Sequence, residues 1–235
     1  MSIDYAGGRF APRAALVEAH RDAWSRIGTA GDWWRAPARV AMIEEVRAAA
    51  TCALCRERRA ALSPNAVAGN HDTHSDLPSS AIDAVHRIVT DPGRLTRAWF
   101  DHIISSGLSA ARYVELVSVV ATTVVIDTTH RAMGLPLPPP PAVIDGPLGQ
   151  QLEHDVVDDG AWLWLARRDD DLASATGLPA VPNIRRALSL VPSAPALFFR
   201  AFMPHYRLRG LDFAISQAQA EFVASRVSAL NECFY

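Results

Sequence analysis

Apolar residues recur every three or four positions along most of the chain, and the alternation typical of a half-buried β-strand is nearly absent. This spacing predicts helices over residues 11–27, 38–62, 79–89, 94–104, 109–133, 184–190, 195–203 and 216–230. Pro37 stands just before the second of these helices, and Ser79 and Ser80 are placed to cap the third. Gly134 ends the fifth, which is the best-defined helix and the expected centre of the core. The predicted fold is all-α.

A proline-rich run separates two similar halves. Residues 135–142 read Leu-Pro-Leu-Pro-Pro-Pro-Pro-Ala, a composition that cannot form a helix and predicts an extended polyproline connector. On either side, Glu115 and Glu221 lie 106 residues apart, and each stands near the start of an apolar helix behind a serine. A pair of predicted helices with a proline turn between them precedes each glutamate. The pattern predicts two all-α repeats.

The composition narrows the classes of function. The 235 residues are 49% hydrophobic and carry a formal net charge of −2, so no broad basic face is expected for nucleic acid or an anionic membrane. All 23 basic residues are arginine, which excludes chemistry that needs lysine, such as Schiff-base catalysis and P-loop phosphate binding. The longest apolar stretch, 114–126, is 13 residues long, shorter than the roughly 20 that span a bilayer. We therefore expect no nucleic-acid partner and no membrane partner.

Three cysteines are the main candidates for chemistry, and residues 1–10 lack the apolar core of a signal peptide, so we expect a reducing, cytoplasmic compartment. Near the C-terminus, Glu221 precedes Cys233 by 12 residues. On one unbroken helix their side chains would lie about 18 Å apart, too far to cooperate. If Asn231 instead ends the helix in a left-handed cap, the chain folds back and brings the thiol to the helix dipole and to Glu221. That arrangement would activate Cys233.

The same segment resembles a known family. From Gln217-Ala-Gln-Ala-Glu221 to Ser228-Ala-Leu-Asn-Glu-Cys233-Phe-Tyr235, the chain is similar to the alkylhydroperoxidase D-like, or carboxymuconolactone decarboxylase, family, whose signature is Glu, eleven residues, Cys-x-x-Cys, three residues and His. The resemblance implies that Glu221 is a proton-relay carboxylate and Cys233 the first redox cysteine. The sequence ends one residue before the second redox position and five before the histidine. Because similar proteins include forms with selenocysteine, encoded by UGA, at that position, we expect that reading stops at such a codon.

The resemblance also implies an organisation and an activity. Residues 1–78 would be a helical N-terminal extension, 79–134 a first, degenerate repeat, 135–182 a connector, and 183–235 a second repeat that is incomplete at its C-terminus. The implied activity is that of a thiol-dependent peroxidase or disulfide oxidoreductase, which reduces hydrogen peroxide or an organic peroxide at a redox cysteine. A protein or small thiol would serve as the reductant, no cofactor is needed, no metal is assigned, and a symmetric homo-oligomer is expected.

Two other functions stay open. The family that the chain resembles also includes decarboxylase-like enzymes without redox cysteines, so the chain could be a proton-transfer enzyme for a small carbonyl compound. It could also be a non-catalytic helical oligomerisation module. The reactivity of the thiols separates these functions from a peroxidase.

A second Cys-x-x-Cys spacing lies in the predicted N-terminal extension. Cys52 and Cys55 precede the run Arg-Glu-Arg-Arg, whose guanidinium groups favour thiolates and hence a redox dithiol or disulfide. The family's glutamate and histidine are missing at the matching positions, where Val40 and Arg59 stand. The pair is therefore a redox candidate without the family's proton relay.

The same two cysteines begin a metal-ligand pattern. Cys52-x2-Cys55-x15-His71-x2-His74 approaches the spacing of a two-Cys, two-His zinc site, although the histidines lie closer together than usual. A redox dithiol, a zinc site and ordinary buried thiols all stay open for the pair. A disulfide from either cysteine to Cys233 is a further arrangement.

Two other sets of residues could take part in chemistry, but each also has a simpler structural interpretation. Asp127 and His130 match the cysteine pair after the 106-residue offset and could pair or bind a metal, but a polar helix end is the simpler interpretation. Tryptophans at 33–34 and at 162 and 164 either line an apolar pocket or pack in the core.

Overall fold

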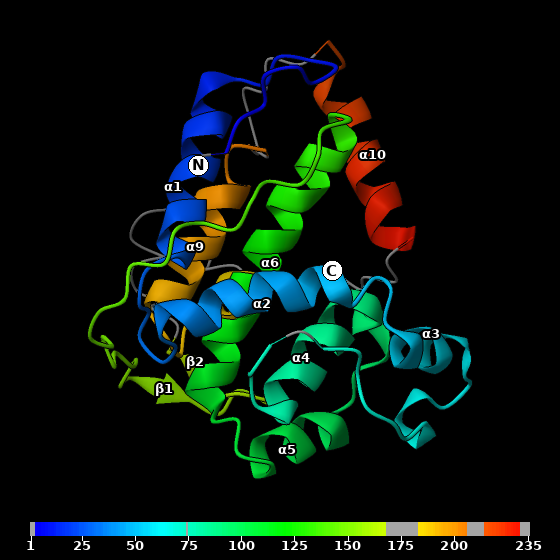
Figure 1. Cartoon of the computed structure of the whole chain (residues 1–235), viewed down its shortest axis with the longest axis vertical. Coiled ribbons are helices and arrows are strands. Elements are labelled where there is room, and N and C mark those ends of the chain that lie inside the picture. The colour runs from blue at the N-terminus through cyan, green and yellow to red at the C-terminus, as the bar shows by residue number, and fades with distance from the viewer. Residues whose placement is uncertain (1–2, 74, 168–182, 206–213, 231–235) are drawn as a thin grey trace.

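The computed structural model describes residues 3–73, 75–167, 183–205 and 214–230. Within these ranges the chain is mostly helical, with one short antiparallel pair of strands (Figure 1). The helices are α1 (Ala14–Ile27), α2 (Ala36–Ala48), α3 (Ala53–Ala60), α4 (Ser79–Thr90), α5 (Arg97–Ser105), α6 (Ala110–Ala132), α8 (Asn183–Ala187), α9 (Ser193–Phe202) and α10 (Gln217–Leu230), with 3-10 helices η1 (Pro64–Ala66) and η2 (Pro92–Arg94). The predicted all-α fold is confirmed.

The long helix α6 forms the centre of the core, as its sequence predicts. It packs against α1, α2, α4 and α9, and most of its buried apolar side chains join the main hydrophobic cluster. The Ser109 hydroxyl accepts a hydrogen bond from the Arg112 backbone N–H and so caps the first turn. Gly134, with φ of +72°, lets the chain turn out of the helix, since this left-handed backbone is favourable for glycine.

The single helix predicted over 38–62 is wrong, because the chain breaks between α2 and α3. The backbone N–H groups of Thr51 and Cys52 both donate to the Ala48 carbonyl at 3.1 Å, and the Thr51 hydroxyl donates to the same carbonyl at 3.3 Å. Cys52 then adopts an extended backbone as the residue that precedes α3. The break turns both cysteines of the Cys-x-x-Cys spacing toward α4, and α3 packs against that helix.

The predicted serine cap of α4 is also wrong. Pro78 precedes the helix, and Ser79 and Ser80 lie inside its first turn without capping it. Ile82 and Val85 on this helix are buried in the main core. Asp83 and His86 on the same helix contact Arg58 and Cys55 of α3. Helix α4 therefore connects the core with the region around α3.

The proline-rich run 135–142 has no regular secondary structure, which agrees with the prediction of a non-helical connector. It lies along the N-terminal helices: the Trp24 indole N–H donates to the Pro139 carbonyl at 2.9 Å, and Arg47 Nη2 donates to that of Pro138 at 2.9 Å. Beyond it, strands β1 (Val156–Val157) and β2 (Leu165–Ala166) form a two-residue antiparallel ladder that the apolar spacing did not indicate.

The two glutamates that suggested a repeat have different surroundings. Glu115 is 1% exposed, pairs with Arg39 and accepts the Trp33 backbone N–H at 2.6 Å. Glu221 accepts a hydrogen bond from Gln217 at 2.6 Å on α10, a helix without buried residues. The two-repeat organisation stays a prediction. No single described helix is long and apolar enough to cross a membrane, and α5 and α6 meet that criterion only as a pair bent by 115°.

Candidate functional site

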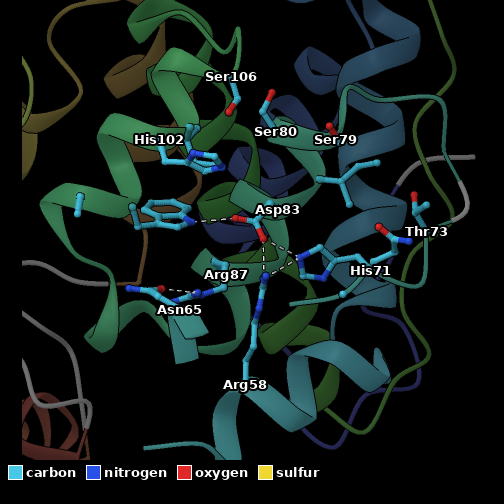
Figure 2. Close-up of a pocket in the computed structure, with 16 residues that line it drawn as sticks. Arg58, Asn65, His71, Thr73, Ser79, Ser80, Asp83, Arg87, His102 and Ser106 are labelled. Atoms are coloured by element: carbon cyan, nitrogen blue, oxygen red, sulfur yellow. Dashed lines mark hydrogen bonds and ion pairs between the residues drawn. The ribbon is translucent and has the colours of Figure 1, made fainter. Parts of the chain in front are cut away.

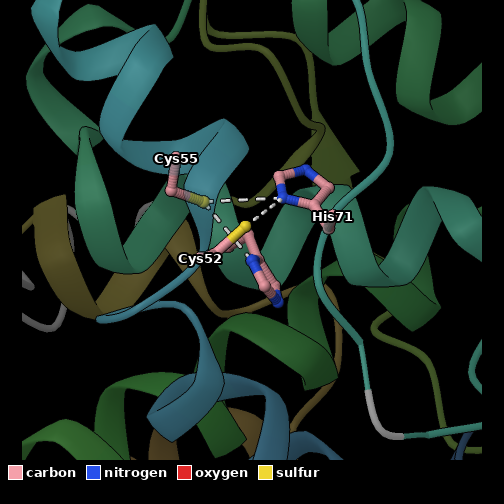
Figure 3. A group of neighbouring side chains, drawn as sticks. Cys52, Cys55 and His71 are labelled. Atoms are coloured by element: carbon pink, nitrogen blue, oxygen red, sulfur yellow. Dashed lines mark hydrogen bonds between the residues drawn. The ribbon is translucent and has the colours of Figure 1, made fainter.

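Two cysteines and two histidines converge between α3 and α4. One potential ligand atom from each of Cys52, Cys55, His71 and His86 lies within 4.8 Å of every other. His71 Nδ1 lies 3.6 Å from the Cys52 sulfur and 3.5 Å from that of Cys55, and His86 Nδ1 lies 3.3 Å from the Cys55 sulfur. Figure 3 shows both sulfurs directed toward the His71 ring. The four side chains form one polar cluster, which we call the Cys-His cluster.

Helix α3 places both thiols. Cys52 is the residue before its first turn and Cys55 lies within that turn, so the two sulfurs face the same side of the helix N-terminus. The Asp72 carboxylate caps α3 by accepting the Ala53 backbone N–H at 2.8 Å. Cys52 is 0% exposed and Cys55 is 3% exposed, and both are free thiols. The sulfurs are therefore held together without a bond between them.

The loop that precedes α4 carries His71, and side chains from two helices hold this loop. Arg58 donates to the Val67 carbonyl at 3.2 Å, and the Thr73 hydroxyl donates to a Glu45 carboxylate oxygen at 2.6 Å. Together with the cap by Asp72, these bonds fix the loop on α2 and α3. Many residues of this loop are exposed, yet these bonds give His71 a defined position.

A carboxylate stands behind the ring of His71. His71 Nε2 lies 2.9 Å from Asp83 Oδ1, to which Arg58 Nη1 also donates at 2.6 Å. The other Asp83 oxygen accepts the Trp99 indole N–H at 2.8 Å. Figure 2 shows Asp83 with His71 and Arg58 directed toward it. Asp83 therefore orients the imidazole so that its Nδ1 faces the two sulfurs.

His86 has an equivalent carboxylate partner. Its Nε2 lies 2.9 Å from Glu45 Oε2, and the side chains of both residues are fully buried. With Nε2–H donating to the carboxylate, Nδ1 of a neutral His86 presents a lone pair to Cys55. Each imidazole of the cluster thus has one nitrogen on a carboxylate and the other on sulfur.

Hydrogen bonds favour charge separation between Cys52 and His71. Burial opposes ionisation of Cys52, yet its pKa is lowered because the backbone N–H groups of Cys55 and Asp72 and the His71 ring donate to its sulfur. Burial likewise opposes the imidazolium of His71, but hydrogen bonds to Asp83 and to both cysteines raise its pKa to about 10. These directions favour a Cys52 thiolate beside a His71 imidazolium.

His86 has the opposite tendency. Burial lowers its pKa, and the hydrogen bond to Glu45 offsets that effect only in part. His86 is therefore neutral at pH 7 and can accept a proton from Cys55.

No protein-family model, curated protein or solved structure matches the chain. The chemistry of the Cys-His cluster must therefore be inferred from its residues and their geometry.

The structure brings together only part of the set of residues that the sequence suggested. Cys52, Cys55 and His71 meet, whereas His74 and Cys233 lie outside the described residues. Glu221 is on α10 and does not belong to the cluster. The fourth member is His86, which the spacing of cysteines and histidines did not identify.

The sequence contains a weak signal for His86, which the cysteine and histidine spacing did not identify. Helix α4 is strongly amphipathic, so a histidine at position 86, directly after the apolar Val85 and four residues from Ile82, falls on or beside its buried face. A buried histidine needs a hydrogen-bond partner, but the sequence does not indicate that Glu45 supplies it.

A cavity of about 730 Å³, with polar and charged side chains among its lining, adjoins the cluster. His71, Asp83 and Arg58 form part of its lining, and Ser80 and His102 stand across from them (Figure 2). Neither cysteine lines this cavity. A molecule in the cavity would therefore meet the imidazole and the carboxylate before it reached sulfur.

The weaker candidates separate from the cluster. Asp127 accepts two hydrogen bonds from Arg47, at 2.9 and 2.8 Å, and His130 Nδ1 lies 3.0 Å from the Ile126 carbonyl, so Asp127 and His130 do not pair with each other. Trp34 is buried in the core. The other three tryptophans that the sequence singled out line a second, apolar cavity of about 690 Å³, together with Phe100; they are Trp33, Trp162 and Trp164.

Proposed function

We propose that the chain is a thiol-dependent oxidoreductase that reduces a small peroxide at Cys52 and Cys55. Two buried, reduced cysteines in a Cys-x-x-Cys spacing contact two imidazoles, each of which is held by a carboxylate at 2.9 Å. This single observation carries the proposal, since a nucleophilic thiol needs a neighbouring base that a third group orients. The proposal transfers the expected peroxidase chemistry from Cys233 to the N-terminal pair.

In the first step, the Cys52 thiolate attacks one oxygen of the peroxide. The O–O bond breaks, Cys52 becomes a sulfenic acid, and the His71 imidazolium gives its proton to the departing alkoxide or hydroxide. Asp83 keeps the His71 ring oriented during the transfer. The products of this step are the sulfenic acid and an alcohol, or water when the substrate is hydrogen peroxide.

In the second step, Cys55 resolves the sulfenic acid. His86 accepts the Cys55 proton, the thiolate attacks the Cys52 sulfur, and hydroxide leaves with that proton as water. The two thiols have then lost two electrons and two protons and share a disulfide, which a dithiol protein or small thiol reduces. Glu45 orients His86 and is a positioning residue.

The burial of the sulfurs favours small substrates. His71 lines the adjoining cavity and the buried cysteines do not, so a substrate from this cavity would have to pass His71 to reach Cys52. Hydrogen peroxide or a short organic peroxide fits such a route better than a bulky lipid peroxide. Gly69 and Asn70, in the loop that carries His71, are exposed and line the cavity, so this loop is a natural place for such access.

Peroxide consumption by purified, metal-free protein with excess dithiol tests the proposal. We expect that Cys52→Ser and Cys55→Ser each lower turnover by more than about 100-fold. Cys233→Ser is the matched control and should retain wild-type turnover. If Cys233→Ser abolishes activity and the other two substitutions do not, the reactive thiol is at the C-terminus and the proposal is wrong.

Two further results would favour the other candidate functions. Thiols that are inert to peroxide throughout the chain, with a stable oligomer, would indicate a non-catalytic helical module. Activity on a small carbonyl compound that is lost in Glu221→Gln and retained in the cysteine variants would indicate proton-transfer chemistry.

A further inference from the structure

We propose that the reduced Cys-His cluster binds one zinc ion through the sulfurs of Cys52 and Cys55 and through Nδ1 of His71 and His86. This site uses His86 in place of the His74 that the sequence spacing suggested, and it takes up the zinc alternative that the sequence left open for Cys52 and Cys55. The binding of zinc does not depend on the proposed peroxidase activity.

The distances match a tetrahedral zinc site. Zinc binds thiolate sulfur at about 2.3 Å and imidazole nitrogen at about 2.0–2.1 Å, so a sulfur and a nitrogen on one tetrahedral ion lie about 3.6 Å apart. The three sulfur–nitrogen distances described above are 3.6, 3.5 and 3.3 Å. All four donor atoms lie within 4.8 Å of one another, so one ion can reach all of them with small adjustments.

The residues around the four donors are those of a metal site. Both histidines present Nδ1 to the centre and place Nε2 on a carboxylate, Asp83 for His71 and Glu45 for His86. Such a carboxylate fixes the tautomer and orientation of a ligating histidine and raises its basicity. Two imidazoles that converge on two sulfurs, each with a carboxylate partner, are also typical of zinc ligation.

Charge and burial favour the ion. Two thiolates and Zn²⁺ cancel, so the ion neutralises the charge of two sulfurs that are 0% and 3% exposed. Soft thiolates with imidazoles in a tetrahedral arrangement select zinc over calcium or magnesium. The four donors close the coordination shell and leave no position for substrate, so the ion would hold α3, the His71 loop and α4 together.

The site also connects zinc with the redox state, an extension that rests on the proposed function. The two thiolates cannot bind zinc and share a disulfide at once. With hydrogen peroxide as oxidant, two zinc-bound thiolates and two protons yield the disulfide, two waters and free Zn²⁺. Zinc would thus protect the reduced pair, and peroxide would release the ion.

Metal titration of the full chain tests the site. Protein that has been reduced and stripped with a chelator is titrated with Zn²⁺ alone, in competition with a chromophoric chelator, and separately with Co²⁺ alone. We expect one metal per chain, with the visible bands of tetrahedral cobalt and a thiolate-to-cobalt charge-transfer band. Absence of binding, or an octahedral cobalt spectrum without the thiolate band, would overturn the proposal.

Substitutions assign the ligands. Cys52→Ser, Cys55→Ser and His86→Gln should each alter the cobalt spectrum and weaken zinc binding by more than about 100-fold. The matched controls His74→Gln and Cys233→Ser should bind as the wild type does. Loss of binding in either control, with binding retained in His86→Gln, would show that the ligand set is wrong; circular dichroism of the metal-free proteins verifies that each variant folds.

The carboxylates give a finer test, because their loss leaves all four ligands in place. Glu45→Gln and Asp83→Asn should keep the tetrahedral cobalt spectrum and weaken zinc binding by about 10- to 100-fold. Unchanged affinity in both variants would contradict the role assigned to the carboxylates.

Release of zinc by peroxide separates the two proposals. Zinc-loaded protein should lose one zinc per chain on treatment with hydrogen peroxide, together with two thiols. If the reduced protein binds zinc but its metal-free form keeps all its thiols in hydrogen peroxide, the peroxidase is refuted and the metal site stands. If the metal-free thiols are oxidised but the reduced protein binds no zinc, the metal site is refuted and the peroxidase stands.

Discussion

Replacement of Asp83 by asparagine should destabilise the protein, since this carboxylate joins three elements around the cluster. It accepts hydrogen bonds from His71 Nε2 at 2.9 Å, Arg58 Nη1 at 2.6 Å and the Trp99 indole at 2.8 Å. An asparagine has one oxygen and one NH₂ group in place of two oxygens. The oxygen can satisfy only one side, so the NH₂ group must face at least one donor.

The geometry sets the size of the effect. The least costly orientation keeps the oxygen on His71 and Arg58 and leaves the Trp99 N–H without an acceptor, which costs about 1–3 kcal/mol. The two remaining bonds change from charged to neutral and lose about 1 kcal/mol each. Because the Asp83 side chain is 21% exposed, water offsets part of this loss. We expect Asp83→Asn to lower the free energy of unfolding by about 3 kcal/mol.

Urea unfolding of the reduced, metal-free protein, followed by tryptophan fluorescence, measures this loss. The matched control is Asp101→Asn on α5, since Asp101 pairs only with Arg97 in an exposed i, i+4 ion pair among the described contacts. That substitution should cost less than about 0.5 kcal/mol. If the two variants lose the same free energy, or if Asp83→Asn loses less than about 1 kcal/mol, the role assigned to Asp83 is refuted.

Three further predictions concern stability. Burial and the neighbouring His205 ring, whose Nε2 lies 2.9 Å from that of His20, lower the pKa of His20 to about 4. Its pKa in the unfolded chain is about 6.5, so protonation favours the unfolded state. The free energy of unfolding should therefore fall as the pH drops from about 6.5 toward 4, by about 2 kcal/mol at pH 5. His20→Gln should remove that difference between pH 7 and pH 5 in urea unfolding, and an unchanged pH dependence would contradict the explanation. Arg47→Met leaves the buried Asp127 without its ion-pair partner and should lower the free energy of unfolding by about 3 kcal/mol. A second substitution, Asp127→Asn, should restore part of this loss, because it removes the unpaired charge. Equal losses in the single and double variants would refute this explanation. Zinc at about 100 times its dissociation constant should stabilise the reduced protein by about 2.7 kcal/mol. In scanning calorimetry, Tm should rise by roughly 5–10 °C. If zinc raises Tm by the same amount after the protein has been oxidised by peroxide, the cysteines are not its ligands.

Periodicity predicted most of the helices, because amphipathic spacing reports which face of a helix is buried. The core role of α6, its Ser109 cap and its Gly134 end all follow from local sequence. The break between α2 and α3 did not, since alanine and arginine favour helix on both sides of it. The turn at Thr51 is stabilised by contacts of the following residues with α4 and with the loop, and these contacts are not visible in a local pattern.

The candidate site was predictable only where its residues are close in sequence. Cys52 and Cys55 stand three positions apart, so their spacing identifies them. His86 lies 31 residues beyond Cys55 and resembles any polar position of an amphipathic helix, and its partner Glu45 stands on another helix. Only the packing of α2, α3 and α4 brings these residues together.

The most direct test of the account is the mass of the peptides after one equivalent of hydrogen peroxide has reacted with reduced, metal-free protein. Trypsin cleaves after Arg47 and Arg56, so a single peptide, 48–56, carries both Cys52 and Cys55, while Cys233 falls in the C-terminal peptide. We expect that peptide 48–56 becomes about 2 Da lighter, as one disulfide requires, and that Cys233 stays reduced. A peptide 48–56 that keeps two free thiols while Cys233 is oxidised would contradict this expectation.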